Sequence, residues 1–280
     1  MKVASYVNGQ WYHASAAGSE LFNAVNGERI GEVSSAGIDF AEVVNYARRV
    51  GGPALRQLTF HERANRLKAL AQHLMAEKES FYRVSAWTGA TRVDSWIDIE
   101  GGIGTLFTYS SLVRREFPNE TFLVEDSTQR LSAEGQFVGR HILVPKEGVA
   151  VHINAFNFPC WGMLEKIAPS LAAGVPVIVK PASVSCYLTE VMVKSIIASG
   201  ILPEGSLQLI CGGVGDLLDQ LNEQVVVTFT GSASTGRQLR SHPNIVANSI
   251  PFTMEADSLN CSILGANVEP GSPEFDLYIK

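Results

Sequence analysis

The fold is decided by residues 149–183, VAVHINAFNFPCWGMLEKIAPSLAAGVPVIVKPAS. Val149–Ile153 is a short apolar run, Cys160–Ala173 has the spacing of a helix, and Val175–Val179 is a second apolar run. A strand, a helix and another strand in this order form a βαβ unit, whose two strands are parallel. Neither apolar run alternates with polar residues, which is typical of strands that are buried on both faces. The stretch therefore predicts a parallel sheet with helices on both faces.

The same alternation continues along the chain. A helical pattern covers Thr189–Ser199, and strands are expected at Leu207–Ile210, Val225–Phe229 and Ile250–Thr253. This spacing predicts an α/β fold with a parallel, Rossmann-type sheet. Ligands bind to such sheets beyond the carboxyl ends of the strands, so the loops that follow the strands are the expected site.

The first 120 residues read mostly as helices. Thr59 and Glu62 form a capping box, which predicts a helix from Phe60 to about Glu79. A second helix is expected from Asp94 to about Ser110. It tolerates the pair Gly101-Gly102 only if another group packs close to it.

A projecting β-hairpin is expected next. Two short apolar runs, Thr121–Val124 and Phe137–Leu143, flank a polar stretch, which is the pattern of two strands joined by a loop. Open strand edges invite pairing with another chain, so this segment is a candidate surface for association.

Composition excludes several classes of protein. The 280 residues carry 22 basic and 28 acidic side chains, a net charge of −6, which disfavours binding to nucleic acid or to an anionic membrane. The longest apolar stretch, Ile167–Val179, is too short to span a bilayer, and residues 1–6 contain no apolar signal core. The four cysteines have no metal-ligand or redox spacing. We expect four reduced, buried thiols in a cytoplasmic protein, and no metal site.

Polar residues cluster in the loops after four strands. They lie in Asn154–Pro159, Lys180–Ser183, Thr230–Gly236 and Met254–Asp257. One sheet edge is thus expected to hold an amide, an ammonium group, a glycine-serine turn and a carboxylate. Gly231-Ser232 before a helix is a plausible phosphate cradle, although the chain has neither a Walker A loop nor a GxGxxG fingerprint.

These residues resemble the aldehyde dehydrogenase family. The resemblance rests on Phe156–Pro159, Lys180–Ala182, Phe229–Ser232 and Glu255, which occur in the order and spacing of the family and extend over nearly the whole chain. Further stretches resemble the dehydrogenase part of the bifunctional ring-opening enzyme of phenylacetate degradation. These stretches are residues 88–92, 98–103, 155–166 and 255–260. The semialdehyde dehydrogenase of the benzoyl-CoA oxidation pathway is the nearest alternative.

The resemblance implies a fold and a domain plan. Residues 1–120 would be the N-terminal helical part of the cofactor-binding domain, residues 121–146 an oligomerisation hairpin, and residues 147–280 a Rossmann-type dinucleotide-binding region. A homo-oligomer, at least a dimer, is implied. The implied substrate is a small aldehyde, namely a CoA-linked semialdehyde from aromatic-acid degradation.

The resemblance also implies roles for single residues. Asn157 matches the amide that holds the developing oxyanion, and Glu255 matches the general base. The cofactor-binding positions are Phe156, Lys180, Ser183, Phe229, Gly231 and Ser232. Family members that prefer NAD commonly have a glutamate where this chain has Ser183, so NADP is the expected cofactor and NAD the alternative. Serine there removes a like-charge clash with a 2′-phosphate.

One departure from the family concerns the nucleophile. The family's cysteine lies beyond its general base in a glycine-containing motif, and Cys261, the only cysteine after Glu255, lies in residues 259–264, which read as a strand. We expect Cys261 to be a structural thiol and the catalytic domain to be absent from this chain. The 280 residues alone would then be inactive. A non-catalytic dinucleotide-binding protein remains an alternative, whereas a nucleotide-hydrolysing domain is disfavoured because Lys-Ser/Thr does not follow Gly236.

Overall fold

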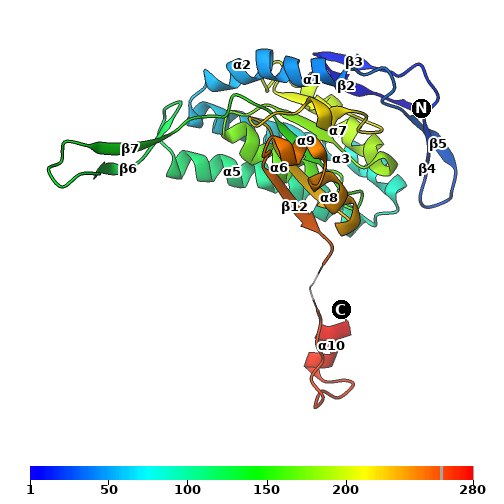
Figure 1. Ribbon diagram of the computed structural model, residues 1–280. Helices are drawn as coiled ribbons and strands as arrows, with labels where there is room; N and C mark the ends of the chain where they lie inside the picture. Colours follow the sequence, from blue (N-terminus) through cyan, green and yellow to red (C-terminus); the bar gives the residue numbers. More distant parts are fainter. Residues whose placement is uncertain (259–260, 280) are drawn as a thin grey trace.

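The computed structural model describes residues 1–258 and 261–279. Its main sheet has seven strands (Figure 1). Their order across the sheet is β12 (Phe252–Ala256), β11 (Val226–Gly231), β8 (Ala150–Ile153), β9 (Val177–Lys180), β10 (Leu207–Leu209), β2 (Ser5–Val7) and β3 (Gln10–Tyr12). The first five strands are mutually parallel, and β2 pairs antiparallel with β10. The parallel, Rossmann-type sheet that the sequence predicts is thus confirmed.

The direction of the chain across the sheet reverses at β8. The chain runs from β8 to β9 and β10 on one side, and then returns to β11 and β12 on the other. The reversal lies between β8 and β11, whose registers pair Ala150 with Val226 and Ile153 with Phe229. A crevice opens at such a point because the connections on either side lead away from it.

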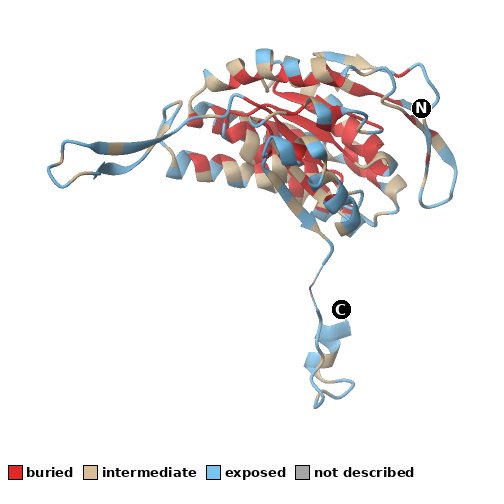
Figure 2. Ribbon diagram, viewed as in Figure 1, coloured by how far each residue is buried: buried red, intermediate tan, exposed pale blue. Residues whose placement is uncertain are grey.

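Helices cover both faces of the sheet (Figure 2). One face packs against α3 (Phe60–Ser85), α5 (Gly102–Glu116), α6 (Trp161–Ala172) and α7 (Cys186–Ala198). The other packs against α1 (Phe40–Tyr46), α8 (Ala233–Arg240) and α9 (Pro243–Ala247), while α2 (Gly52–Arg56) continues from α1 through η1 (Ala47–Gly51). In β9, Val177 and Val179 belong to the first core and Ile178 to the second, so this strand is buried on both faces.

The second expected helix is one continuous helical stretch with a π-helical turn in its middle. It comprises α4 (Arg92–Trp96), η3 (Ile97–Gly101) and α5. Gly101 and Gly102 lie where this stretch meets α6, and Trp161 occupies the space that their side chains would need. A Cβ atom on Gly102 would lie 2.8 Å from the Cα of Trp161. The close packing that the sequence required at this glycine pair is therefore present.

The expected hairpin projects from the body of the molecule (Figure 1). It consists of β6 (Leu123–Arg130) and β7 (Val138–Leu143), which pair antiparallel with a register shift between Glu125 and Gln129. Apolar side chains are exposed along it, among them Phe137, Val138 and Ile142. Toward the other end of the chain, α10 (Pro273–Ile279) begins at a proline, and none of its residues is buried.

Two expectations from the sequence are wrong, and a third, that the first 120 residues are mostly helical, does not extend to residues 1–33. Residues 1–33 are not helical: they form β1 (Lys2–Val3), β2, β3, β4 (Ser19–Phe22) and β5 (Arg29–Val33). Of the strand expected at 259–264, residues 259–260 lie outside the described residues, and 261–264 are irregular. Cys261 is exposed, whereas Cys160, Cys186 and Cys211 are buried. Short strands and an apolar loop carry little periodicity, so the pattern misled in both places.

No described helix combines the length and the apolar character that a membrane crossing requires.

The helix crossing at the glycine pair yields a prediction. Gly102→Ala should lower the free energy of unfolding by about 1–3 kcal/mol, because the new methyl group meets the backbone of Trp161. Gly104→Ala, two residues along the same helix with open space around it, should be neutral or stabilising by up to about 1 kcal/mol. Urea unfolding of both variants measures the difference. Equal stabilities would contradict close packing at Gly102.

Candidate functional site

A cavity of about 740 Å³ lies at the carboxyl ends of β8, β11 and β12. The loop after β8 lines it from Ile153 to Asn157, the end of β11 from Phe229 to Ser232, and the end of β12 from Glu255 to Ser258. Ala182 lines it from the loop after β9, and Thr235 from α8. The cavity thus occupies the crevice at the strand reversal, and its volume is within the range of small-molecule sites.

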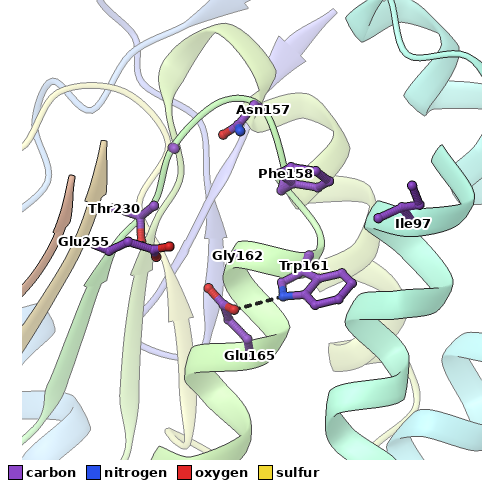
Figure 3. A pocket seen from close by; sticks show the side chains of 9 residues that line it. Ile97, Asn157, Phe158, Trp161, Gly162, Glu165, Thr230 and Glu255 are labelled. Atoms are coloured by element: carbon purple, nitrogen blue, oxygen red, sulfur yellow. Dashed lines mark hydrogen bonds between the residues drawn. The ribbon is translucent and has the colours of Figure 1, made fainter. Parts of the chain in front are cut away.

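A second cavity of about 330 Å³ lies beside it, toward α6 and η3 (Figure 3). Its lining residues include Ile97, Phe158, Trp161 and Glu165. The two cavities share four lining residues, which are Ala155, Asn157, Thr230 and Glu255. Asn157 and Glu255, the two residues that the sequence singled out for catalysis, therefore lie at the boundary between the cavities.

Asn157 is exposed in the loop between β8 and α6. Its side-chain amide has no hydrogen-bond partner among the described residues, so its N–H groups are free to donate to a bound molecule. A buried carboxylate fixes the end of this loop. Asp98 of η3 accepts hydrogen bonds from the backbone N–H groups of Cys160, at 3.0 Å, and Trp161, at 2.7 Å, at the start of α6. These bonds satisfy donors that a helix start leaves unpaired.

Burial raises the pKa of Asp98 to about 6. The N–H groups of Trp161 and Cys160 favour the charged form and oppose this shift, but loss of hydration is the larger effect. The carboxylate that anchors the loop is therefore one that titrates in a mildly acidic range.

Glu255 lies within β12 and not after it, as the sequence had suggested. It pairs in register with Thr230 of β11, and its Oε2 accepts a hydrogen bond of 3.1 Å from the Thr230 hydroxyl. The side chain is exposed to the cavities, so the other carboxylate oxygen is available to accept a proton.

The glycine-serine turn after β11 begins α8. The Ser232 hydroxyl caps this helix by accepting the backbone N–H of Thr235 at 3.3 Å, and the N–H of Ala233 donates to Asp257 at 3.2 Å. The absence of a side chain at Gly231 has a packing reason: a Cβ atom there would lie 2.7 Å from the Phe229 ring. Asp257 therefore occupies one of the donors that a phosphate would use.

Lys180 and Ser183 lie beside the large cavity but do not line it. Lys180 is buried, and its ammonium group donates to the Pro181 carbonyl at 2.9 Å. Burial lowers its pKa. The Ser183 hydroxyl donates to the Gly212 carbonyl at 3.2 Å, which ties the loops after β9 and β10 together, so this side chain does not cap the following helix.

Phe156 and Phe229 both line the large cavity, in different environments. Phe156 is exposed, whereas Phe229 is buried and stacks on Phe252, with 6.5 Å between the ring centroids. Of the cofactor positions proposed from the sequence, the structure thus brings Phe156, Phe229, Gly231 and Ser232 to the cavity.

The buried cysteines are poor nucleophiles. Burial raises the pKa of both Cys160 and Cys211 well above the usual range, and neighbouring Asp98 adds to the effect at Cys160. A raised pKa keeps a thiol protonated, and the thiolate is the reactive form.

The structure gives roles to three residues of the predicted loops that the sequence had not singled out, namely Asn154, Thr230 and Asp257. Asn154 lines the large cavity, and its buried side-chain nitrogen and oxygen have no hydrogen-bond partner among the described residues. Thr230 and Asp257 become visible as site residues only through the pairing of β11 with β12 and the position of α8. In the sequence, Asn154 was indicated only by its place directly after the buried strand Val149–Ile153.

Comparisons with known proteins agree with this architecture. The sequence profile of the aldehyde dehydrogenase family matches residues 11–269. A 3,4-dehydroadipyl-CoA semialdehyde dehydrogenase from Aromatoleum evansii is 45% identical over 100% of this chain and 54% of its own length. A succinate-semialdehyde dehydrogenase [NADP(+)] from Escherichia coli is 27% identical over 83% of this chain and 47% of its own length. The chain thus spans about half the length of these relatives.

The fold is also similar to that of a solved structure. A betaine aldehyde dehydrogenase from Staphylococcus aureus, in complex with NAD+, superimposes with a TM-score of 0.76 at 23% identity. The match covers 91% of this chain and 50% of that protein.

The buried anchor of the Asn157 loop yields a prediction. A raised folded-state pKa means that the Asp98 contribution to stability is fully present below pH 3.8 and is lost as pH rises through about 6. The change amounts to about 3 kcal/mol at most. Asp98→Asn, which cannot titrate, should lack this slope in the free energy of unfolding between pH 4 and pH 6. Parallel slopes for the two proteins in urea unfolding would rule out a shifted Asp98.

Proposed function

Because the chain belongs to the aldehyde dehydrogenase family, we propose that it binds a nicotinamide dinucleotide at the strand reversal and serves in oxidation of an aldehyde to a carboxylic acid. The observation that carries this proposal is the position of Asn157 and Glu255. They line both the large cavity and the smaller one beside it. Oxidation by hydride transfer requires the cofactor and the aldehyde to lie next to each other, and the boundary between the two cavities is a place where they can.

The large cavity fits a dinucleotide in several respects. It lies at the strand reversal, where such ligands bind. Asn154 presents an amide whose nitrogen and oxygen lack partners among the described residues, and buried polar groups of this kind cost about 1–3 kcal/mol until they are paired. We assign Phe156, Phe229, Gly231 and Ser232 to the cofactor site, with Lys180 and Ser183 at the adenosine end. A phosphate group at α8 would compete with Asp257 for the N–H of Ala233.

The residues of this chain have separable roles in the proposed reaction. When bound, a nicotinamide cofactor would supply the acceptor for the hydride that leaves the aldehyde carbon. Asn157 donates a hydrogen bond to the oxygen that becomes negatively charged, and a neutral amide does so without giving up a proton. Glu255 accepts a proton from the attacking group, while the Thr230 hydroxyl holds its Oε2. The attacking thiol, whose proton Glu255 would accept, is assigned to a cysteine other than the buried Cys160, Cys186 and Cys211.

The substrate class and the assembly are finer parts of the proposal. The similarity to a CoA-semialdehyde dehydrogenase favours a CoA-linked semialdehyde from aromatic-acid degradation, by the phenylacetate or the benzoyl-CoA route. The exposed apolar residues of the β6–β7 hairpin support association into at least a dimer. A cytoplasmic location stays a prediction from the sequence.

Glu255 provides the first test of this function. In the active enzyme, Glu255→Gln should lower turnover by about 10²–10⁴-fold, because the amide cannot accept a proton. Affinity for the cofactor should change by less than about threefold. Turnover is followed as aldehyde-dependent cofactor reduction, and affinity by calorimetric titration.

The matched control for Glu255 is Glu223→Gln, which removes an exposed carboxylate that lines neither cavity. Loss of cofactor binding with normal turnover per bound cofactor would show that Glu255 is not the base. Cofactor binding without any aldehyde oxidation, in an enzyme of full family length, would favour a non-catalytic dinucleotide-binding protein.

Ser183 provides a test of cofactor choice. We expect the wild type to bind NADP+ more tightly than NAD+, by roughly tenfold to a hundredfold, since one charge-assisted contact to the 2′-phosphate contributes about 1.5–3 kcal/mol. Ser183→Glu should reverse the preference by placing a carboxylate beside that phosphate. Ser127→Glu adds the same charge on the hairpin and should leave the ratio unchanged. Equal wild-type affinities, or an unaltered ratio in Ser183→Glu, would contradict the electrostatic argument.

A further inference from the structure

The smaller cavity has a one-sided charge distribution. Two carboxylates, Glu165 and Glu255, are among the residues that line it, and those residues include no lysine, arginine or histidine. Figure 3 shows the two side chains approaching the same space from α6 and β12. The function proposed above uses Glu255 and leaves Glu165 without a role.

Glu165 is held in place by both of its oxygens. Its Oε2 accepts a hydrogen bond of 2.9 Å from the indole N–H of Trp161, one helical turn earlier (Figure 3). Its Oε1 accepts from the ammonium group of Lys166 at 2.7 Å. About a third of the Glu165 side chain stays exposed, against 11% for Lys166. The carboxylate is therefore both fixed and accessible.

The cation that pairs with Glu165 does not line the smaller cavity. Lys166 lines a neighbouring cavity, together with Thr105, Tyr109 and His152, and Glu165 lies in the wall between the two. The ammonium group of Lys166 also donates to the Gly162 carbonyl at 3.1 Å. A molecule in the smaller cavity consequently meets the carboxylate of Glu165 directly. With Glu255, Glu165 and Lys166 counted together, the local charge is −1.

We propose that Glu165 determines substrate specificity: it disfavours aldehydes that carry a free carboxylate and favours those whose far end is uncharged, such as a thioester, ester or amide. This inference rests on the proposed function. A substrate carboxylate in this cavity would face two carboxylates, and the nearby cation, Lys166, is already paired with Glu165 and does not line the cavity. The remaining repulsion destabilises such a substrate near a partly desolvated wall. A neutral acyl chain meets no such repulsion, and an amide N–H along that chain could donate to Glu165. Repulsion between charges about 6 Å apart at a protein surface corresponds to an effect on the order of tenfold in affinity.

The experiment measures binding of two matched ketones, 4-oxopentanoate and its methyl ester. Both resemble short semialdehydes, and neither can be oxidised because the carbonyl carbon carries no hydrogen. Calorimetric titration therefore measures the affinity of each ketone for the cavity independently of turnover. We expect the wild type to bind the ester about tenfold more tightly than the acid. Glu165→Gln should bring the two affinities to within about twofold.

Two further variants separate charge from structure. Glu165→Asp keeps the charge while shortening the side chain, so it should retain most of the preference for the ester. Glu223→Gln removes a carboxylate elsewhere and should retain all of it. Circular dichroism of each variant checks that the fold is intact.

The inference is overturned if the wild type binds both ketones equally or binds neither. It is also overturned if Glu165→Gln keeps the preference for the ester, or if Glu165→Asp loses it while folded. Titration of NADP+ and NAD+ on the same samples distinguishes failure of the inference on Glu165 from failure of the proposed function. A protein that binds a cofactor but shows no role for Glu165 retains the proposed function, whereas one that binds neither cofactor loses both.

Discussion

The site depends on the reversal of strand order between β8 and β11. Each parallel strand needs a connection that crosses a face of the sheet, and the connections that leave β8 and β11 lead to opposite sides. No crossover therefore covers the carboxyl edge between these strands, and the 740 Å³ cavity lies there. The two residues proposed for catalysis lie at this opening. The loop after β8 carries the amide of Asn157, and the pairing of β12 with β11 positions the carboxylate of Glu255.

The helical layer fixes that opening from outside the sheet. Gly101 and Gly102 allow the stretch from α4 to α5 to lie directly against Trp161, and Asp98 on the same stretch accepts the first N–H groups of α6. One contact region thus sets both the start of α6 and the end of the loop that carries Asn157. The same approach places Trp161 so that its indole can hold Glu165. The contact between this helical stretch and the start of α6 determines both the packing and the geometry of the site. A substitution at the helix crossing is therefore expected to change the shape of both cavities.

Periodicity in the sequence correctly predicted the long, buried helices and the buried strands. The capping box at Thr59 and Glu62 has both of its hydrogen bonds, and the apolar runs from Val149 onward are strands of a parallel sheet. The pattern failed where burial is partial. Residues 1–33 form strands of two to five residues, which are too short for alternation to be decisive, and Cys261 is an exposed residue within a run that reads as a strand. The residues that reach the cavity depend on side-chain direction, which spacing does not encode. Lys180 turns toward its own backbone, and Ser183 bonds to the neighbouring loop.

The two cavities also differ in the polarity and charge of the side chains that line them. The larger one combines the amide of Asn154, which has no partner among the described residues, with the exposed ring of Phe156, a mixture that suits a ligand with both polar and flat apolar parts. The smaller one is narrower and carries carboxylates from two elements, one hydrogen-bonded to a hydroxyl and the other to an indole and an ammonium group. A base must keep an oxygen free, and Glu255 has one hydrogen-bonded oxygen, whereas both oxygens of Glu165 are engaged. The difference in hydrogen bonding supports the proposal that Glu255 transfers the proton and that Glu165 is a fixed negative charge in the wall.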